Sequence, residues 1–319
     1  MPDVAWTSEG CHTLTSLKFG TRVVDRLEPL PSDAVAELRR GYFACVSFVD
    51  SLVGRVLSEA THTDDIVVLS SDHGFHLGEQ NSWTKHTLFE HSTRVPLIVR
   101  APGLAPRRET QHFADLVDLY RTLADLAGLP APAPEVQGRS LFASPGRNFS
   151  VAQYPRCFKS WNRLWDSNCK RTAKAAIPVM GYTIRVPGFR FTEWLYAKNG
   201  VTDFRRAPLA TELYALSSVA DFDDFEVHNI APTHPCVTHH LRAALFLFVD
   251  SCQHDEANRL CEARINEAIA AAHRCAGGRQ TIGDSTSVIG GGAPPAEAAK
   301  RSGYPPAERR RRHRNHRDR

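Results

Sequence analysis

The chain has 319 residues, of which 42% are hydrophobic and 23% are charged. This composition is that of a globular protein with a core, and it excludes a chain that is disordered or fibrous throughout. The formal net charge is +4, but the last twenty residues hold nine Lys and Arg against two acids. The rest of the chain is therefore slightly acidic.

Residues 1–31 are predicted to form an irregular segment, because their composition is mixed and they end in the turn-forming Pro29-Leu30-Pro31. Met1 is followed by neither a basic nor an apolar leader, so no secretory signal is predicted. The longest apolar run, around residues 243–249, is too short to span a bilayer. No membrane partner is therefore expected.

A helix is predicted from Ser32, which is a suitable N-cap. Apolar residues follow at spacings of three or four, at Val35, Leu38, Tyr42, Val46, Val49, Val53 and Leu57. This pattern predicts a helix that covers one face of a sheet. Cys45 lies near the apolar side and is expected to be buried as a small hydrophobic residue.

The next stretch, residues 64–102, carries the candidate site. Residues 66–69 (Ile-Val-Val-Leu) predict a short buried strand, and residues 95–100 predict a second one. Asp72, His73 and Gly74 follow the first strand, at the end where ligands bind in open α/β sheets. Asp and His can both be metal ligands. The alternative is an ordinary strand-ending turn with a solvated histidine.

Residues 115–127 predict a second amphipathic helix that ends at Gly128. A stiff Pro-rich connection over residues 130–134 follows. Short β-forming runs separated by turns then predict an antiparallel sheet. They cover residues 151–154, 181–186, 189–195 and 212–216.

The loop at residues 156–178 is basic, through Lys159, Arg163, Lys170, Arg171 and Lys174. It would suit an acidic polysaccharide, although most charge runs are simply solvated. Cys157 and Cys169 could form a disulfide in this loop, and sequence alone does not give the pairing. None of the Cys and His spacings indicates a zinc site.

Residues 236–276 have helical character, and residues 277–319 are predicted to be a disordered basic tail. The tail's Arg-rich run could bind nucleic acid or other polyanions. The chain contains no recognised nucleic-acid-binding module, which argues against that role.

Several motifs in this order resemble the sulfatase family, and most of all its iduronate-type branch. The resemblance extends roughly from Asp33 to Ala231. The motifs that carry it lie at residues 71–74 (Ser-Asp-His-Gly), 77–79 (Leu-Gly-Glu), 83–85 (Trp-x-Lys), 89–90 (Phe-Glu), 94–98, 152–156, 180–185, 189–194 and 212–214.

The resemblance implies an α/β fold, with an alkaline-phosphatase or sulfatase-like sheet flanked by helices. Only the C-terminal portion of that catalytic domain would be present, over residues 32–140. A smaller antiparallel β lobe would occupy residues 141–235, with the helical extension after it.

The resemblance also assigns roles to single residues. Asp72 and His73 match positions that complete a calcium site beside the bound sulfate ester. Lys85 matches the lysine that contacts the sulfate, so His73 and Lys85 are the catalytic candidates. Trp83 is a candidate substrate-binding residue, although anchoring of the loop to the core is the favoured role for both Trp83 and Phe75. His76, His86 and His91 are expected to titrate near neutral pH.

This sequence departs from the family in two respects. The family's formylglycine arises from a Cys-x-Pro-x-Arg motif, and none of the eight cysteines begins one. The paired aspartates of the family's first strand are also missing, so the calcium site would be incomplete. A truncated sulfatase is therefore expected, acting on a sulfated sugar or glycosaminoglycan. Such enzymes are lysosomal, secreted or periplasmic.

Three alternatives stay open at this point. One is an inactive sulfatase-like module that binds sulfated glycans. Another is a phosphate or phosphonate ester hydrolase of the same superfamily. The third concerns the substrate, because the likeness extends to sulfatases that act on other sugars and on choline esters.

Overall fold

The computed structural model describes residues 30–60, 62–104, 112–133, 136–142, 147–159, 164–166, 169, 172–216, 226–251 and 258–277. The irregular segment expected at residues 1–31, except for its last two residues, lies outside this set. The predicted basic tail after Gly277 also lies outside it.

Helix α2 (Ser32–Ala60) begins at the predicted residue. Contrary to expectation, most of its apolar side chains are exposed, with Phe43 58% and Phe48 64% accessible. Cys45 is an exposed free cysteine, which corrects the prediction that it is buried. The helix contacts the site region through Arg39 Nε, which donates to the Leu77 carbonyl oxygen at 2.9 Å.

The same helix corrects the expectation that no segment is long and apolar enough to cross a membrane. By length and composition alone, its residues Ser32–Glu59 meet that criterion. The criterion is also met by core helices of soluble proteins and by signal sequences. Among the described residues, no other segment covers the apolar side of α2 from Phe43 to Val56.

Strands β1 (Val67–Ser70) and β4 (Leu97–Arg100) form an antiparallel pair, with Val67 opposite Arg100. Between them lie the small hairpin of β2 (His76–Leu77) and β3 (Trp83–Thr84) and the short helix α3 (Glu90–Thr93). The two predicted strands are thus present, each shifted by one or two residues, but β1 is not buried as predicted, since Leu69 is 42% exposed. The polar connection between them is compact rather than an open loop.

A 3-10 turn, η3 (Leu116–Asp118), leads into α4 (Leu119–Leu126), as the amphipathic pattern predicted. Asp115 and Asp118 form a reciprocal capping box at the start of this helical segment. Gly138 lies close to it, where an added Cβ would be 2.3 Å from the Val117 carbonyl oxygen. Only glycine therefore allows the chain to pass this point.

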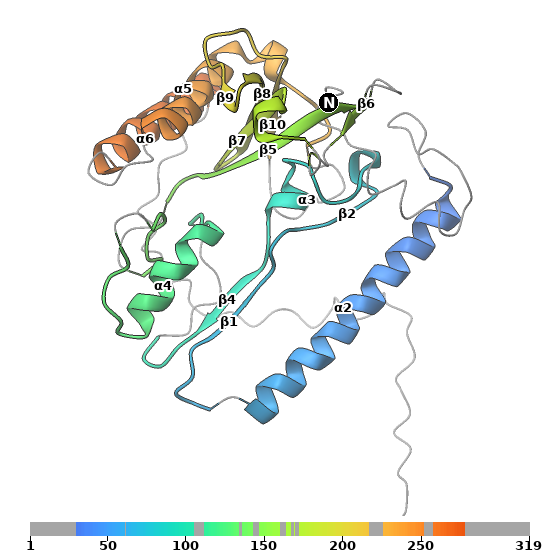
Figure 1. Ribbon diagram of the computed structural model, residues 1–319, viewed down its shortest axis with the longest axis vertical. Helices are drawn as coiled ribbons and strands as arrows, with labels where there is room; N and C mark the ends of the chain where they lie inside the picture. Colours follow the sequence, from blue (N-terminus) through green and yellow to red (C-terminus); the bar gives the residue numbers. More distant parts are fainter. Residues whose placement is uncertain are drawn as a thin grey trace, which may run out of the picture. The chain divides into compact units, whose positions relative to one another are not determined.

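The predicted antiparallel lobe is a six-stranded sheet of order β10-β8-β7-β5-β6, with β9 paired to β8 (Figure 1). Consecutive hairpins explain this order, since β7 and β8 are joined by a tight turn at Pro187-Gly188. The strands are β5 (Ser150–Lys159), β6 (Leu164–Asp166), β7 (Val179–Val186), β8 (Phe189–Lys198), β9 (Val201–Thr202) and β10 (Ala210–Ala215).

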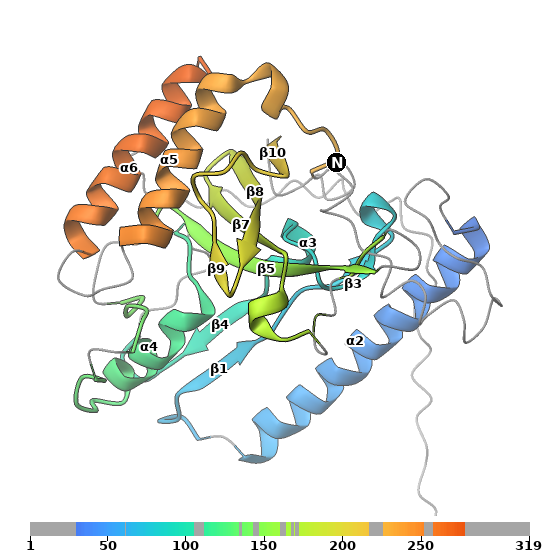
Figure 2. The same cartoon turned by 45° about the horizontal axis from the view of Figure 1, so that its top comes forward.

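Two antiparallel helices, α5 (Pro235–Ser251) and α6 (Asn258–Cys275), lie side by side against this sheet (Figure 2). Their buried residues, including Leu241, Leu245 and Ile265, share one core with Ile184 and Phe191 of the sheet. The helices and the sheet each turn an apolar side toward this core. Burial of these apolar side chains therefore drives the packing. The expected helical extension is therefore an integral layer of the core.

We expect the chain expressed alone to aggregate or to stay partly unfolded. Within the described residues, β1 and β4 pair only with each other, and Ile98 is 60% exposed. Unpaired strand edges beside exposed apolar side chains favour association between chains. Size-exclusion chromatography with a thermal melt checks this. A monomer with one sharp cooperative melt would count against it.

Candidate functional site

The candidate site lies where the chain leaves β1. His73 Nδ1 is 2.8 Å from the Gly74 carbonyl oxygen. A carbonyl oxygen can only accept a hydrogen bond, so Nδ1 carries the hydrogen. His73 Nε2 is therefore the atom with the lone pair, and it lies 2.6 Å from Lys85 Nζ, which donates to it. Asp72 Oδ2 is 3.4 Å from the same nitrogen. The structure thus brings together three residues that the sequence separates by up to thirteen positions.

The three side chains differ in their access to solvent. The Asp72 side chain is 83% exposed and the His73 side chain 31% exposed. Lys85 is half-buried. A carboxylate, an imidazole and an ammonium therefore meet at an accessible position, where an anionic ligand can reach the ammonium group.

Gly74 has a stricter role than the turn suggested by the sequence. Its amide donates to the Ser92 carbonyl oxygen at 2.9 Å. A Cβ at this position would lie 2.0 Å from the His91 carbonyl oxygen. Glycine is therefore required because α3 packs directly on the backbone that follows His73.

The backbone around Lys85 adopts unusual conformations. Thr84 has φ +69° and His86 has φ +80°, and both are non-glycine residues. Left-handed conformations of a β-branched residue are energetically costly and persist only where the surroundings impose them. The flanks of Lys85 are thus held in place by tertiary contacts, as is common at functional sites.

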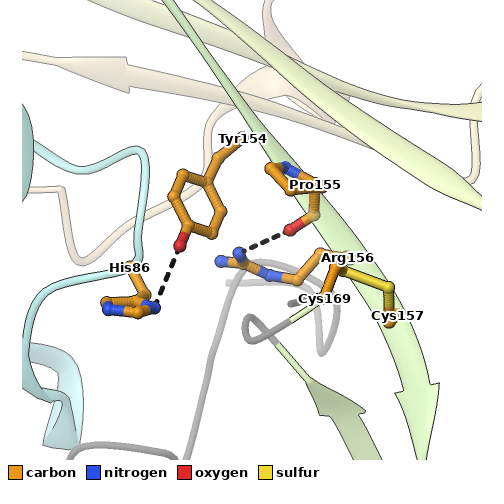
Figure 3. The surroundings of a disulfide bond; sticks show 6 residues. All are labelled: His86, Tyr154, Pro155, Arg156, Cys157 and Cys169. Atoms are coloured by element: carbon orange, nitrogen blue, oxygen red, sulfur yellow. Dashed lines mark hydrogen bonds between the residues drawn. A yellow bond between two sulfur atoms is a disulfide. The ribbon is translucent and has the colours of Figure 1, made fainter. Parts of the chain in front are cut away.

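One of these contacts comes from β5. The Tyr154 hydroxyl lies 2.9 Å from His86 Nδ1 (Figure 3). Next to Tyr154 in the strand, Arg156 is fully buried and its guanidinium lies 4.7 Å from the Trp194 ring. The disulfide between Cys157 and Cys169, one of the pairings left open above, closes the following loop. The six-stranded sheet therefore fixes the residue next to Lys85.

Trp83 does not line an open site. It is 2% exposed and packs with Leu30 and Ala34, with Leu38 and Leu77 alongside. This burial corrects its assignment as a substrate-binding residue and favours the anchoring role. Phe75 stacks on Tyr42 of α2 with ring centroids 5.1 Å apart, so it is also a packing residue.

His76 does not titrate near neutral pH. It is fully buried, and burial lowers its pKa from 6.5 to about 3, with a further contribution from His91. Its Nε2 is 2.8 Å from Thr87 Oγ1, which also pairs with Ser92 Oγ at 2.8 Å. His76 is thus a neutral structural group beneath the site, and no local pattern in the sequence indicated its burial.

A buried ionic network joins the site segment to the six-stranded sheet, and sequence reasoning missed it. Glu90 of α3 pairs with Arg190 and, at 3.3 Å, with Arg185. Its backbone amide donates to Glu226 Oε2 at 2.6 Å, and Glu226 pairs in turn with Arg190. Although burial opposes it, the arginines lower the pKa of Glu90, which stays ionised.

Apolar packing reinforces the same junction. Leu88 and Phe89, which precede Glu90, pack against Val179, Trp194 and Tyr214 of the sheet. The segment that carries Lys85 is therefore attached to the sheet by a core cluster and by four charged residues. Long-range pairs of this kind leave no local pattern, so no periodicity or spacing could have found them.

Glu226 gives this network a pH dependence. Burial raises its pKa from 4.5 to about 7, in spite of Arg190. Between these values the folded state keeps a proton that the unfolded chain loses, so stability falls as pH rises from about 4.5 to 7. The titration of Glu226 lowers the free energy of unfolding by roughly 3 kcal/mol across this pH range. We expect Glu226→Gln to remove this pH-dependent change.

The measurement is the urea midpoint as a function of pH, for the wild type and Glu226→Gln. Glu267→Gln, at an exposed position on α6, is the matched control and should keep the wild-type slope. The side-chain amide oxygen introduced by Glu226→Gln can still accept the Glu90 amide hydrogen, so the change removes the titration and keeps the hydrogen bond. Equal slopes for the wild type and Glu226→Gln would refute the assignment.

The calcium ion that the resemblance implies takes six to eight oxygen ligands. Asp72 offers exposed carboxylate oxygens, and His73 Nε2 would offer its lone pair only when Lys85 Nζ no longer donates to it. These two groups fit one side of a metal site, and the described residues around them supply no third acidic or imidazole donor.

Comparisons with known proteins agree with the resemblance. Residues 8–129 match the family model described as Sulfatase. The chain is 32% identical to mouse iduronate 2-sulfatase over 52% of this chain and 39% of that protein. It is 27% identical to bovine arylsulfatase K over 64% of this chain and 35% of that protein. The chain therefore spans about two fifths of the length of these relatives.

Solved structures give a more distant likeness. A sulfatase structure from Bacteroides thetaiotaomicron is 22% identical, with a TM-score of 0.49 over 72% of this chain and 47% of that chain. The matched segment of the family model contains Asp72, His73 and Lys85. Residues 8–129 of the chain thus match the sulfatase family model, and the relatives named here are sulfatases.

Proposed function

We propose that this chain supplies the sulfate-contacting and part of the metal-binding residues of a sulfatase that hydrolyses sulfate esters. The observation that carries the proposal is the contact of Lys85 Nζ with His73 Nε2 at 2.6 Å, beside the exposed carboxylate of Asp72. Both residues lie in the segment that matches the sulfatase family.

Lys85 is the residue that would touch the sulfate group. Its ammonium would stabilise the negative charge that grows on the sulfuryl and leaving oxygens as the S–O bond breaks. His73 orients the ammonium by accepting one of its hydrogens, and the carbonyl oxygen of Gly74 fixes the tautomer that makes this possible.

Asp72 would hold the calcium ion that the family resemblance implies, and His73 would join it through Nε2 once Lys85 Nζ donates to the sulfate instead. When bound, such an ion supplies a fixed positive charge beside the sulfate ester. The remaining ligands would come from outside the part of the chain that the structure describes. The same holds for the nucleophile, because the chain contains no Cys-x-Pro-x-Arg motif.

A sulfated sugar is the favoured substrate class. Iduronate 2-sulfatase, one of the relatives, is named for its action on a sugar acid. Tyr154 and His86 would border the sulfate position, and they offer a hydroxyl and a ring nitrogen to a polar ligand. A glycosaminoglycan or a related sulfated saccharide fits these groups.

A second candidate is a sulfatase-like module that binds sulfated glycans without turnover, and the missing nucleophile motif favours it. The phosphate or phosphonate ester hydrolase is less well supported. Such an enzyme needs more carboxylate and imidazole ligands than the two that meet at the end of β1 in the described part of the chain.

The first experiment is to sequence full-length transcripts across the codon for Met1. An in-frame upstream segment that encodes Cys-x-Pro-x-Arg and an Asp-Asp pair supports the sulfatase. Transcripts that start at Met1 would favour the glycan-binding module over the sulfatase.

The second experiment separates these candidates biochemically. Calorimetry measures binding of a sulfated disaccharide to the chain, with and without calcium, and release of inorganic sulfate measures turnover. If the chain is part of a sulfatase, the protein encoded with the in-frame upstream segment should release sulfate in a calcium-dependent way. Asp72→Asn should abolish this release. Saturable binding of the disaccharide, with no sulfate release by either the chain or its longer form, would indicate the binding module. Hydrolysis of a phosphorylated disaccharide, with no release of sulfate from the sulfated one, would overturn both.

A further inference from the structure

A cluster of metal-ligating side chains lies far from the proposed sulfate site, on the α5–α6 hairpin. Cys236 and His240 are four residues apart on α5, so they lie on the same face of that helix. Cys275 is the last residue of α6, which runs antiparallel to α5. One ligand atom from each of these three residues lies within 4.8 Å of the other two.

In the structure, Cys236 and Cys275 form a disulfide, which bridges a sequence separation of 39 residues. The bond therefore ties the start of α5 to the end of α6. Cys236 is exposed, whereas His240 and Cys275 are half-buried. A dithiol reductant from solvent can thus reach this bond.

We propose that, once this disulfide is reduced, Cys236, His240 and Cys275 form a binding site for Zn²⁺ or another thiophilic divalent ion. Two thiolates and one imidazole are a soft donor set that zinc prefers to calcium or magnesium. Three protein ligands leave a fourth, open position for water or a small ligand.

Reduction of the disulfide and binding of the ion are two separate steps. A dithiol reductant transfers two electrons and two protons to the disulfide and becomes a disulfide itself. The two thiols of Cys236 and Cys275 then lose two protons when they bind the divalent ion, and the neutral His240 adds a nitrogen ligand. Exchange with a small-molecule disulfide, which accepts the two electrons and leaves as two thiols, would re-form the Cys236–Cys275 bond and release the ion.

The hairpin keeps the three ligands together without the disulfide. Val237 and Leu241, which flank the cluster on α5, are at most 1% exposed, as is Ala272 on α6. All three belong to the main core. On α6, His273 Nε2 lies 2.8 Å from the Pro187 carbonyl oxygen. Reduction therefore frees the thiols but leaves the two helices packed on the sheet.

The required movement is small. Tetrahedral zinc with sulfur and nitrogen ligands places those atoms roughly 3.5–3.8 Å apart. The two sulfurs need only separate from bonding distance by rotation about their side-chain bonds. The sequence did not predict this site, because Cys275 comes from a second helix and the spacing matches no linear zinc motif.

The test uses the full chain, treated with a dithiol reductant and then titrated with Co²⁺ under anaerobic conditions. Thiolate-to-cobalt charge-transfer absorbance and the visible bands of tetrahedral cobalt should appear, and Zn²⁺ should remove them. The oxidised chain should show neither. No such bands in the reduced chain would overturn the proposal.

Two matched variants exclude binding by other thiols. His240→Ala should weaken cobalt binding by more than about 100-fold, because it removes a ligand. His239→Ala, at the neighbouring exposed position on α5, should leave binding unchanged. Equal affinities for the two variants would show that the ion binds elsewhere. Circular dichroism verifies that both variants keep their helices.

Discussion

Replacement of Arg190 by Met is expected to lower the free energy of unfolding by about 3–5 kcal/mol. Arg190 is 2% exposed and is the partner of two buried carboxylates, Glu90 and Glu226. Without the guanidinium, the ionised Glu90 keeps only Arg185 as a buried counter-charge, and the pKa of Glu226 rises further. The cost comes mainly from the uncompensated charge and not from lost packing, because Met retains most of the apolar volume.

The measurement is pulse proteolysis in urea on the dilute full chain, following the fragment that contains the six-stranded sheet. Arg264→Met, on the exposed side of α6, should change the free energy of unfolding by less than about 0.5 kcal/mol. The triple change Arg190→Met, Glu90→Gln and Glu226→Gln should recover much of the loss. If it recovers nothing, the electrostatic explanation fails and shape alone accounts for the effect.

Under the proposed function, replacement of Lys85 by Met is expected to lower sulfate ester hydrolysis by about 10²–10³-fold. The ammonium lies 2.6 Å from His73 Nε2 and is half-buried, so its position is defined before an ester binds. A preorganised charge of this kind acts mostly on the transition state. The loss should therefore appear in kcat more than in KM.

Lys198→Met is the matched control, because Lys198 is an exposed lysine at the end of β8. It should retain full activity. Lys85→Arg should rescue only part of the rate, since the guanidinium keeps the charge but not the compact shape of the ammonium. If Lys85→Met and Lys198→Met behave alike, Lys85 is a solvated loop residue.

The regular elements could largely be predicted from the sequence. Apolar spacing predicted α2 from its first residue and both strands around the site, and alternating β-forming runs predicted the antiparallel sheet. These features depend on local propensity and on the period of the apolar residues, which a single sequence displays directly. The grouping of Asp72 and His73 at the end of a strand was visible for the same reason.

What covers an element does not follow from its pattern. An amphipathic α2 was expected to lie on a sheet, yet its Phe43 and Cys45 are exposed. Trp83 was placed near the substrate and lies in a core. Periodicity tells which side of an element is apolar, but burial depends on which other segments are present to cover that side.

The sequence by itself determined the family, the order of the elements and the identity of Asp72, His73 and Lys85 as candidates. The tertiary structure decided which side chains act together. Lys85 meets His73, Tyr154 meets His86, and Glu90 meets Arg190 a hundred positions away. Such pairs are fixed by the packing of separate segments, which brings together groups that share no local signal.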